Sequence, residues 1–257
     1  MADLESVLRA RRDGGGRVFV PYVTGGFPGV DAALLRELVS CGADAIEVGI
    51  PFSDPVMDGG VIQEASRRAL EAGAGPASIL STIAGAAVSV PVVVMTYVNP
   101  VFVRGFEGFL EEAVRVGVAG TIVPDLPVDE AGEWGAACER HGVANVLLAA
   151  PGTADDRLAK IGATSRGFVY CVATYGVTGA RDSLAGTAGE LVARLRPVTD
   201  LPLLIGVGVG SPDQAAKAGS FADGVIVGSA LMRRLVEGDR DGMLRLAAAF
   251  RTVLPVA

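Results

Sequence analysis

The sequence predicts an α/β fold, a single (β/α)8 TIM barrel of parallel strands. Short apolar runs rich in β-branched residues recur eight times, and segments with helical periodicity separate them. Apolar runs without polar alternation are typical of strands that helices cover on both faces, as in an all-parallel sheet. The chain has 257 residues. Because a closed barrel of this kind takes about 250 residues, we favour it over an open doubly wound sheet.

The predicted strands follow the chain at regular intervals, and each is followed by a helical pattern. They are Val18–Val23, Ala45–Ile50, Val92–Tyr97, Gly120–Val123, Asn145–Ala149, Gly167–Cys171, Pro202–Ile205 and Gly224–Val227. The longest spacings predict extra helices at the N-terminus and between the second and third strands. No linker, charge block or change of composition divides the chain, so we expect one domain over residues 1–257.

Several helices carry their own boundary signals. The segment Val30–Cys41 places leucines on one face, and Gly105–Val116 repeats apolar residues at i, i+3, i+4, i+7 and i+8. Ser211 followed by Pro212 has the spacing of a capped helix start. The amphipathic segment Arg240–Leu254 predicts the last helix.

Composition excludes several classes of function. The formal net charge of −7 and the lack of a long basic run argue against a nucleic-acid surface. The cysteines are three in number, scattered, and without metal-ligand spacing, which indicates thiols in a reducing compartment. The N-terminus resembles an amphipathic helix and not a signal peptide. Prolines interrupt the uncharged run 72–103, so we expect a helix and a buried strand there, no membrane span, and a cytoplasmic protein.

The segment Ala45–Gln63 carries the strongest signal for chemistry. Strand alternation turns Glu47 away from its apolar neighbours, and in a sheet covered on both faces this carboxylate is buried with no basic residue nearby in sequence. Burial raises the pKa of an unpaired acid toward neutrality, as a general acid/base requires. Asp58 follows in a turn-rich loop. The alternatives are a tolerated polar residue at Glu47 and a turn former at Asp58.

Glycine-rich turns late in the chain predict a phosphate site. One turn spans residues 206–211 after the seventh strand, and the other begins at Gly228 after the eighth. Each ends a strand and opens a helix, where free backbone N–H groups meet the positive end of the helix dipole. Close strand–helix packing through glycine is the alternative. A small, polar loop over 175–181 suits either a mobile lid or an ordinary solvent loop.

The basic residues that commonly act in catalysis fall in predicted helices. His141, Lys160 and Lys217 all follow helical patterns, where a barrel turns side chains outward. A Schiff base, a histidine-based triad and a histidine metal site are therefore disfavoured. Two carboxylates above a phosphate pocket could break a carbon–carbon bond if the substrate itself supplied the electron sink, as a protonatable electron-rich ring does.

Four stretches of sequence resemble the tryptophan synthase alpha subunit family. They are I-E-V-G-I-P-F-S-D-P-V-M-D-G from residue 46, Y-G-V-T-G from residue 175, and G-V-G-V-G-S-P-D-Q from residue 206 with V-G-S-A from residue 227. The resemblance runs essentially from end to end. It implies a barrel that cleaves indole-3-glycerol phosphate to indole and glyceraldehyde 3-phosphate, with no cofactor and no metal.

The resemblance also implies roles for individual residues. Glu47 would protonate indole C3 and take the proton of the glycerol hydroxyl, and Asp58 would hold the indole N–H. Thr178 would be the lid threonine that meets the second acid on closure. The positions implied to bind phosphate are Gly179, Gly208, Gly228 and Ser229. Those implied to line the indole pocket are Tyr22, Met95, Ile122, Tyr170 and Val207, with Tyr170 beside Glu47.

A partner follows from the same resemblance: a pyridoxal-phosphate-dependent beta subunit that receives indole in an alpha2beta2 assembly. Pro51, Asp54 and Asn99 match positions at that interface, although ordinary turn chemistry of Asp-Pro and Asn-Pro explains them equally well. The sequence departs from the common pattern at Gly60, which replaces a proline.

The sequence also departs from the family pattern at Val207, which replaces a phenylalanine, and at 172–175, which lacks a Ser-Arg pair. Gly60 and 172–175 concern loops whose closure is coupled to the partner in the family. Two other functions stay open at this point. One is a stand-alone lyase with the same chemistry, and the other is a catalytically silent barrel that activates a partner.

Overall fold

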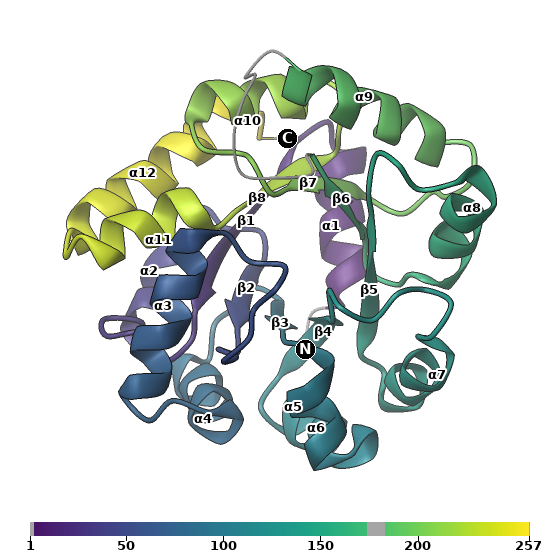
Figure 1. The fold of residues 1–257 in the computed structure, drawn as a ribbon. Helices are drawn as coiled ribbons and strands as arrows, with labels where there is room; N and C mark the ends of the chain where they lie inside the picture. The colour runs from purple at the N-terminus through teal and green to yellow at the C-terminus, as the bar shows by residue number, and fades with distance from the viewer. Residues whose placement is uncertain (1–2, 174–182, 257) are drawn as a thin grey trace.

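The computed structural model describes residues 3–173 and 183–256, and in it the strands close into one parallel barrel in sequence order (Figure 1). Pairing of β8 with β1 closes the ring. This confirms the predicted (β/α)8 fold. The strands are β1 Val18–Thr24, β2 Ile46–Gly49, β3 Val92–Met95, β4 Val118–Ile122, β5 Ala144–Ala149, β6 Val169–Val172, β7 Leu203–Gly206 and β8 Gly224–Val227.

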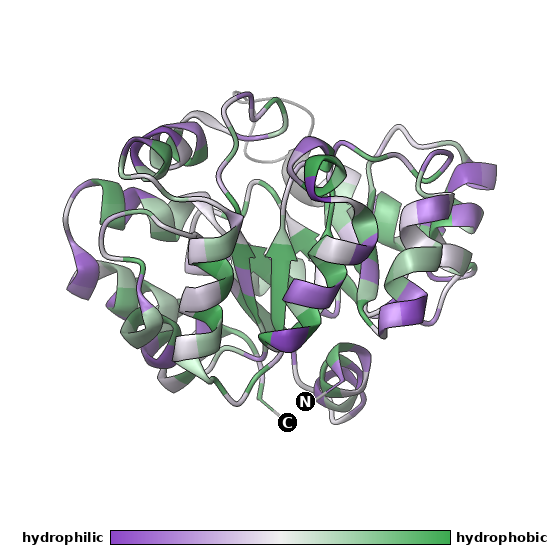
Figure 2. Cartoon of the chain, turned by 90° about the horizontal axis from the view of Figure 1, so that it is seen from below, coloured by the Kyte–Doolittle hydropathy of each residue, from purple (hydrophilic) through white to green (hydrophobic). Residues whose placement is uncertain are grey.

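Helices surround the barrel, and their apolar faces pack against the strands (Figures 1 and 2). Within the described residues none of them is long and apolar enough to cross a membrane. They are α1 Leu4–Asp13, α2 Ala32–Ser40, α3 Gly60–Glu71, α4 Pro76–Ala86, α5 Val98–Arg104, α6 Phe106–Arg115, α7 Gly132–His141, α8 Asp155–Thr164, α9 Ser183–Leu195, α10 Pro212–Gly219, α11 Ser229–Val236 and α12 Arg240–Val253. The extra helices predicted at the N-terminus and between β2 and β3 are confirmed by α1 and by the pair α3 and α4.

The third strand is shorter than the sequence predicts. The prediction extended it to Tyr97, but β3 ends at Met95 and α5 begins at Val98. Pro100, one of the prolines that interrupt the uncharged run 72–103, lies in the first turn of α5 together with Asn99. A proline fits there because the first N–H groups of a helix have no intrahelical partner. Tyr97 therefore stands at the N-cap of a helix above the barrel.

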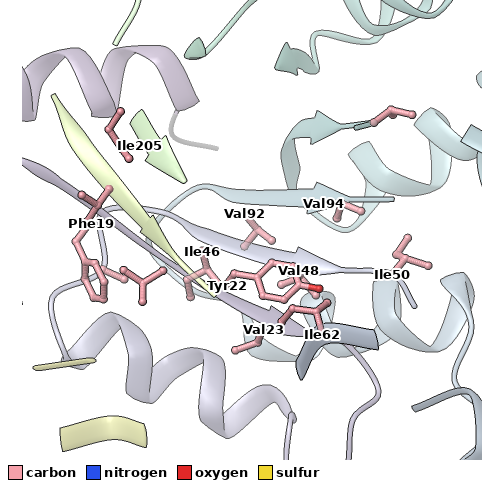
Figure 3. Close-up of a cluster of buried hydrophobic side chains, with 14 of the residues drawn as sticks. Phe19, Tyr22, Val23, Ile46, Val48, Ile50, Ile62, Val92, Val94 and Ile205 are labelled. Atoms are coloured by element: carbon pink, nitrogen blue, oxygen red, sulfur yellow. The ribbon is translucent and has the colours of Figure 1, made fainter. Parts of the chain in front are cut away.

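The core has two layers, one inside the barrel and one between the strands and the helices. Val18, Val20, Ala45 and Val93 belong to the inner cluster. Alternate residues of the same strands, such as Phe19, Val23, Ile46 and Val92, belong to the outer cluster (Figure 3). Because Glu47 shares the phase of Ala45, its side chain points into the barrel.

Helix α1 closes the end of the barrel from which the strands start, and both chain termini lie at that end (Figure 2). Leu4 and Leu8 are buried in the inner cluster. A Cβ on Gly120 or Gly167 would lie 2.8 Å from Leu4 Cδ2, so glycine at both positions lets the leucine insert. This apolar plug leaves the opposite end, where the strands finish, for the predicted site.

Candidate active site

Glu47 is a buried carboxyl group without a countercharge. Its side chain lies on β2 between Tyr22 of β1 and Val93 of β3, its register partners. The residue is 1% exposed, and its Oε2 atom accepts no hydrogen bond from the described residues. Burial, followed by the negative charge of Asp58, raises the pKa of Glu47 to about 8. Glu47 is therefore protonated at neutral pH, as its strand position predicts.

Asp58 lies in the loop that joins β2 to α3. Burial raises the pKa of Asp58 to about 6, and interaction with the Tyr97 hydroxyl partly offsets the rise. Asp58 is thus largely ionised at neutral pH while Glu47 is protonated. The negative charge of Asp58 acts on Glu47, so the two acids titrate as a coupled pair.

Tyr97 fixes this loop, a role that the sequence did not indicate. Its hydroxyl accepts a hydrogen bond of 3.0 Å from the Met57 backbone N–H and also interacts with Asp58. The Tyr97 ring stacks on Phe52, with 5.2 Å between the ring centroids. A prediction that ended β3 at Met95 would have placed the Tyr97 hydroxyl just past the carboxyl end of a barrel strand. Residues at that position commonly belong to the active site, so this would have indicated a role for Tyr97.

A small cavity of about 10 Å3 lies between Asp58 and the ends of β1, β2 and β3. That is about the volume that one water molecule needs. Ser66 of α3 lines it and is 3% exposed, a second residue that sequence reasoning missed. A ligand the size of an aromatic ring therefore requires side chains around Tyr22, Met95 and Tyr97 to move.

Two buried tyrosines flank the acids, and glycines make room for both. A Cβ on Gly49 would collide with the Tyr22 hydroxyl, and one on Gly206 would collide with the Tyr170 hydroxyl. Burial raises the pKa of both tyrosines, and the negative charge of Glu47 adds to the rise. Both hydroxyls therefore remain protonated at any physiological pH. In Figure 3 the Tyr22 hydroxyl points toward Ile50, just past the end of β2.

The two predicted glycine turns meet at the ends of β7 and β8, which are paired neighbours. In the first turn Val207 and Gly208 both have positive φ, 58° and 102°. In the second turn Gly228 is the N-cap of α11 and Ser229 its first residue. A Cβ on Gly228 would lie 3.2 Å from the Tyr22 ring, so close packing also favours glycine there. The turns adjoin as the phosphate prediction requires.

Comparison with known proteins identifies the family. The family model described as "Tryptophan synthase alpha chain" matches residues 8–252. The alpha chain of Carboxydothermus hydrogenoformans is 42% identical over 258 residues, covering 96% of each chain. This chain belongs to the tryptophan synthase alpha chain family. The tryptophan synthase alpha chain of Streptomyces avermitilis is 44% identical to this chain, and the match covers 92% of this chain and 87% of the Streptomyces protein.

Solved structures of the same family share the fold over the whole length. A tryptophan synthase structure from Mycobacterium tuberculosis superposes with a TM-score of 0.91 at 39% identity, covering 100% of both chains. The tryptophan synthase alpha subunit of Legionella pneumophila gives 0.89 at 30% identity, covering 98% of both. The family that the sequence motifs resemble is thus confirmed, and so is the TIM barrel.

The resemblance implies roles for several other residues. Those that the structure describes lie at the same end of the barrel as Glu47 and Asp58. Met95 and Ile122 end β3 and β4, and Val207 is 48% exposed in the loop after β7. Pro51 is buried after β2, while Asp54 in the same loop and Asn99 in α5 are exposed. Thr178 and Gly179 lie outside the described residues.

The histidine and the lysines lie on the outer helices, as predicted. His141 ends α7 and contacts Glu107 of α6 at 2.6 Å, whereas Lys160 and Lys217 lie in α8 and α10. Residues 3–173 and 183–256 contain no group of three or more His, Cys, Asp or Glu side chains arranged to hold a metal ion.

Proposed function

We propose that this chain cleaves indole-3-glycerol phosphate to indole and glyceraldehyde 3-phosphate, as the alpha subunit of tryptophan synthase. One observation carries the proposal: at the open end of the barrel the buried carboxyl group of Glu47 has a pKa of about 8 and the half-buried one of Asp58 a pKa of about 6. At neutral pH this arrangement supplies a proton donor and a fixed negative charge side by side. Membership of the family names the substrate.

The pKa order assigns the first step to Glu47 acting as an acid. Its protonated carboxyl group transfers a proton to C3 of the indole ring, and the ring becomes an indolenine cation. The Asp58 carboxylate stabilises that cation by accepting a hydrogen bond from the ring N–H. Because Asp58 is partly shielded from solvent, the attraction between cation and carboxylate exceeds what it would be in water.

The second step uses the carboxylate that the first step leaves on Glu47. This carboxylate takes the proton of the glycerol hydroxyl while the bond between C3 and the side chain breaks. The bonding electron pair enters the indolenine cation and restores indole, and the hydroxyl carbon becomes the aldehyde. Glu47 ends protonated, so the cycle returns the enzyme to its starting state with no external acid or base.

The remaining assigned residues hold the substrate. We propose that Gly208, Gly228 and Ser229, together with Gly179, bind its phosphate at the turns after β7 and β8. Thr178 would close over the site beside Asp58. The ring would lie among the pocket residues Tyr22, Met95, Ile122, Tyr170 and Val207.

The beta subunit is proposed to cover an apolar surface beside the site. Val56 and Met57 in the β2–α3 loop are 78% and 52% exposed, and Phe102 and Val103 of α5 are 72% and 77% exposed. The bond from Met57 to Tyr97 joins the two segments. Exposed apolar side chains on segments that are joined in this way are typical of an interaction surface. Pro51, Asp54 and Asn99 belong to the same two segments, which supports an alpha2beta2 assembly.

The cellular location is also proposed: a cytoplasmic protein. All three cysteines are free, and Cys138 and Cys171 are buried. Free thiols agree with a reducing compartment.

The decisive test is release of glyceraldehyde 3-phosphate from indole-3-glycerol phosphate, measured with and without a tryptophan synthase beta subunit. We expect slow cleavage that beta accelerates, loss of cleavage in Glu47→Gln, and normal cleavage in the exposed control Glu111→Gln. Phe102→Asp is expected to reduce the stimulation by beta. Fast cleavage indifferent to beta would indicate a stand-alone lyase. No cleavage under any condition would indicate a silent barrel and would overturn the proposal.

A further inference from the structure

A large cleft runs along the outside of the barrel between α7 and α8 and reaches the end that α1 covers. Its volume is about 630 Å3, within the range of small-molecule sites. It is lined by α1, by α7 along its length with the loop before it, by the last turn of α8, and by β5 between these two helices. We call it the basal cleft. None of the residues assigned to the cleavage reaction lines it.

Asn145 of β5 forms the floor of the basal cleft. Its neighbours Ala144 and Val146 pack inside the barrel, so alternation turns Asn145 outward between α7 and α8. The residue is 5% exposed, and its side-chain amide makes no hydrogen bond to any described part of the chain, whereas its main chain is paired in the sheet and with Arg166. The amide atoms are not among the fully enclosed polar atoms that lack a partner, so they are open to the cleft, where a ligand or water can take the place of a protein partner.

The walls indicate which chemistry fits this floor. Buried apolar side chains line one wall, among them Val128, Cys138, Val143 and Leu147. Such a wall accommodates an apolar body, while the floor amide offers an NH2 group as donor and a carbonyl oxygen as acceptor.

The charges around the cleft disfavour an anion. Arg9 is paired with Glu5, and Lys160 is paired with Asp129. The Arg166 guanidinium donates to the carbonyl oxygens at the end of α8. Among the described residues each basic group of the lining thus has a partner, and its acidic groups outnumber its basic ones.

We propose that the basal cleft binds a small uncharged molecule with an apolar body and an amide-type edge, such as a carboxamide or a lactam. Its N–H and C=O would pair with Oδ1 and Nδ2 of Asn145. The inference stands on the cleft itself, so it holds whether or not the proposed reaction is correct.

Gly135 of α7 gives a way to close the site without touching Asn145. A Cβ at this position would lie 3.3 Å from Asn145 Nδ2, so a larger side chain would project onto the amide. Gly135 is within a helix, where leucine is the more favourable residue, so the helix itself gains stability. Gly108 of α6 is also helical, but a Cβ there meets nothing within 4 Å. Gly108→Leu is the matched control.

The test uses three probes with one ring and different head groups: benzamide, benzoate and benzylammonium. Binding to the full chain is followed in 15N–1H NMR spectra, where the side-chain NH2 signal of Asn145 is identified by its loss in Asn145→Leu. We expect saturable binding of benzamide that shifts this signal, and weaker binding of both charged probes. Loss of a donor and an acceptor in Asn145→Leu should weaken binding about tenfold.

Gly135→Leu is expected to abolish benzamide binding, and Gly108→Leu to leave it unchanged. Circular dichroism establishes that each variant is folded before binding is measured. The proposal is overturned if benzamide does not bind the wild-type chain, if a charged probe binds more tightly, or if binding survives in Gly135→Leu. Benzamide binding that survives in Gly135→Leu would mean that benzamide binds elsewhere, for example in the pocket near Glu47. The Asn145 amide would then bind only water.

Discussion

Replacing Glu47 by glutamine should stabilise the protein, and increasingly so as the pH rises. In the folded chain burial holds the pKa of Glu47 at about 8, whereas its ordinary value is 4.5. Below pH 4.5 the carboxyl group is neutral in both the folded and the unfolded state, so wild type and Glu47→Gln should be about equally stable. Above that pH the unfolded chain gains stability by ionising while the folded chain cannot.

The size of this effect follows from the two pKa values. Between pH 4.5 and 8 the unfolding free energy of the wild type should fall relative to Glu47→Gln by about 1.4 kcal/mol for each pH unit. Above pH 8 both states are ionised, and the difference levels off at roughly 5 kcal/mol, an upper figure because the folded site can relax.

Urea unfolding at pH 5, 7 and 9 measures this difference. The chain has a single tryptophan, Trp134, which is 1% exposed and packs against Phe106 and Phe109, so its fluorescence reports unfolding. Glu111→Gln, on the exposed face of α6, should follow the wild type at each pH. A difference between wild type and Glu47→Gln that stays constant from pH 5 to 9 would refute the reasoning, because it would mean that Glu47 ionises as freely in the folded state.

Three further predictions concern Asp58, the Tyr97 side chain that contacts its loop, and Val207 in the turn after β7. Asp58→Asn should lower the pKa of Glu47, because the Asp58 charge raises it; 13C NMR titration of glutamate-labelled protein measures this, and an unchanged pKa would show that the acids are independent. Tyr97→Phe should raise the pKa of Asp58 and lower kcat/KM about tenfold near pH 6, since the loop loses a hydrogen bond to Met57 as well. Unaltered kinetics would contradict the role given to Tyr97. Val207→Asn should raise the unfolding free energy by about 1 kcal/mol, because asparagine tolerates positive φ better than a β-branched residue. Val207→Thr, also β-branched, should give no such gain in thermal unfolding, and equal effects would contradict the strain.

The barrel was predictable because strand periodicity and chain length act together. Eight apolar runs of parallel-sheet type in a chain of this size leave few other ways to bury both faces of each strand. The inward direction of Glu47 followed from the same alternation. Helix starts with explicit caps were predictable too: the Ser211 side chain accepts from the Gln214 N–H, as its spacing indicates.

What the sequence did not show depends on contacts between distant segments. The sequence predicts a strand that ends at Tyr97, since its neighbours are β-branched, whereas the contact of Tyr97 with Met57 joins residues 40 apart in the chain. In the sequence Ser66 has the pattern of an ordinary helix residue. Only the packing of α3 against the ends of β1 and β2 shows that it lines the cavity near Asp58. Asn145 likewise lay inside a predicted strand, and the cleft beneath it depends on the separation of α7 and α8. No local pattern encodes such distances.

The pH dependence of kcat/KM for cleavage of indole-3-glycerol phosphate tests the central claim most directly. In the free enzyme the reaction needs Asp58 ionised and Glu47 protonated, so the profile should be bell-shaped, rising near pH 6 and falling near pH 8. A profile that rises near pH 4.5 and stays level beyond pH 8 would contradict the account. It would show that the ionised form of Glu47 begins the reaction.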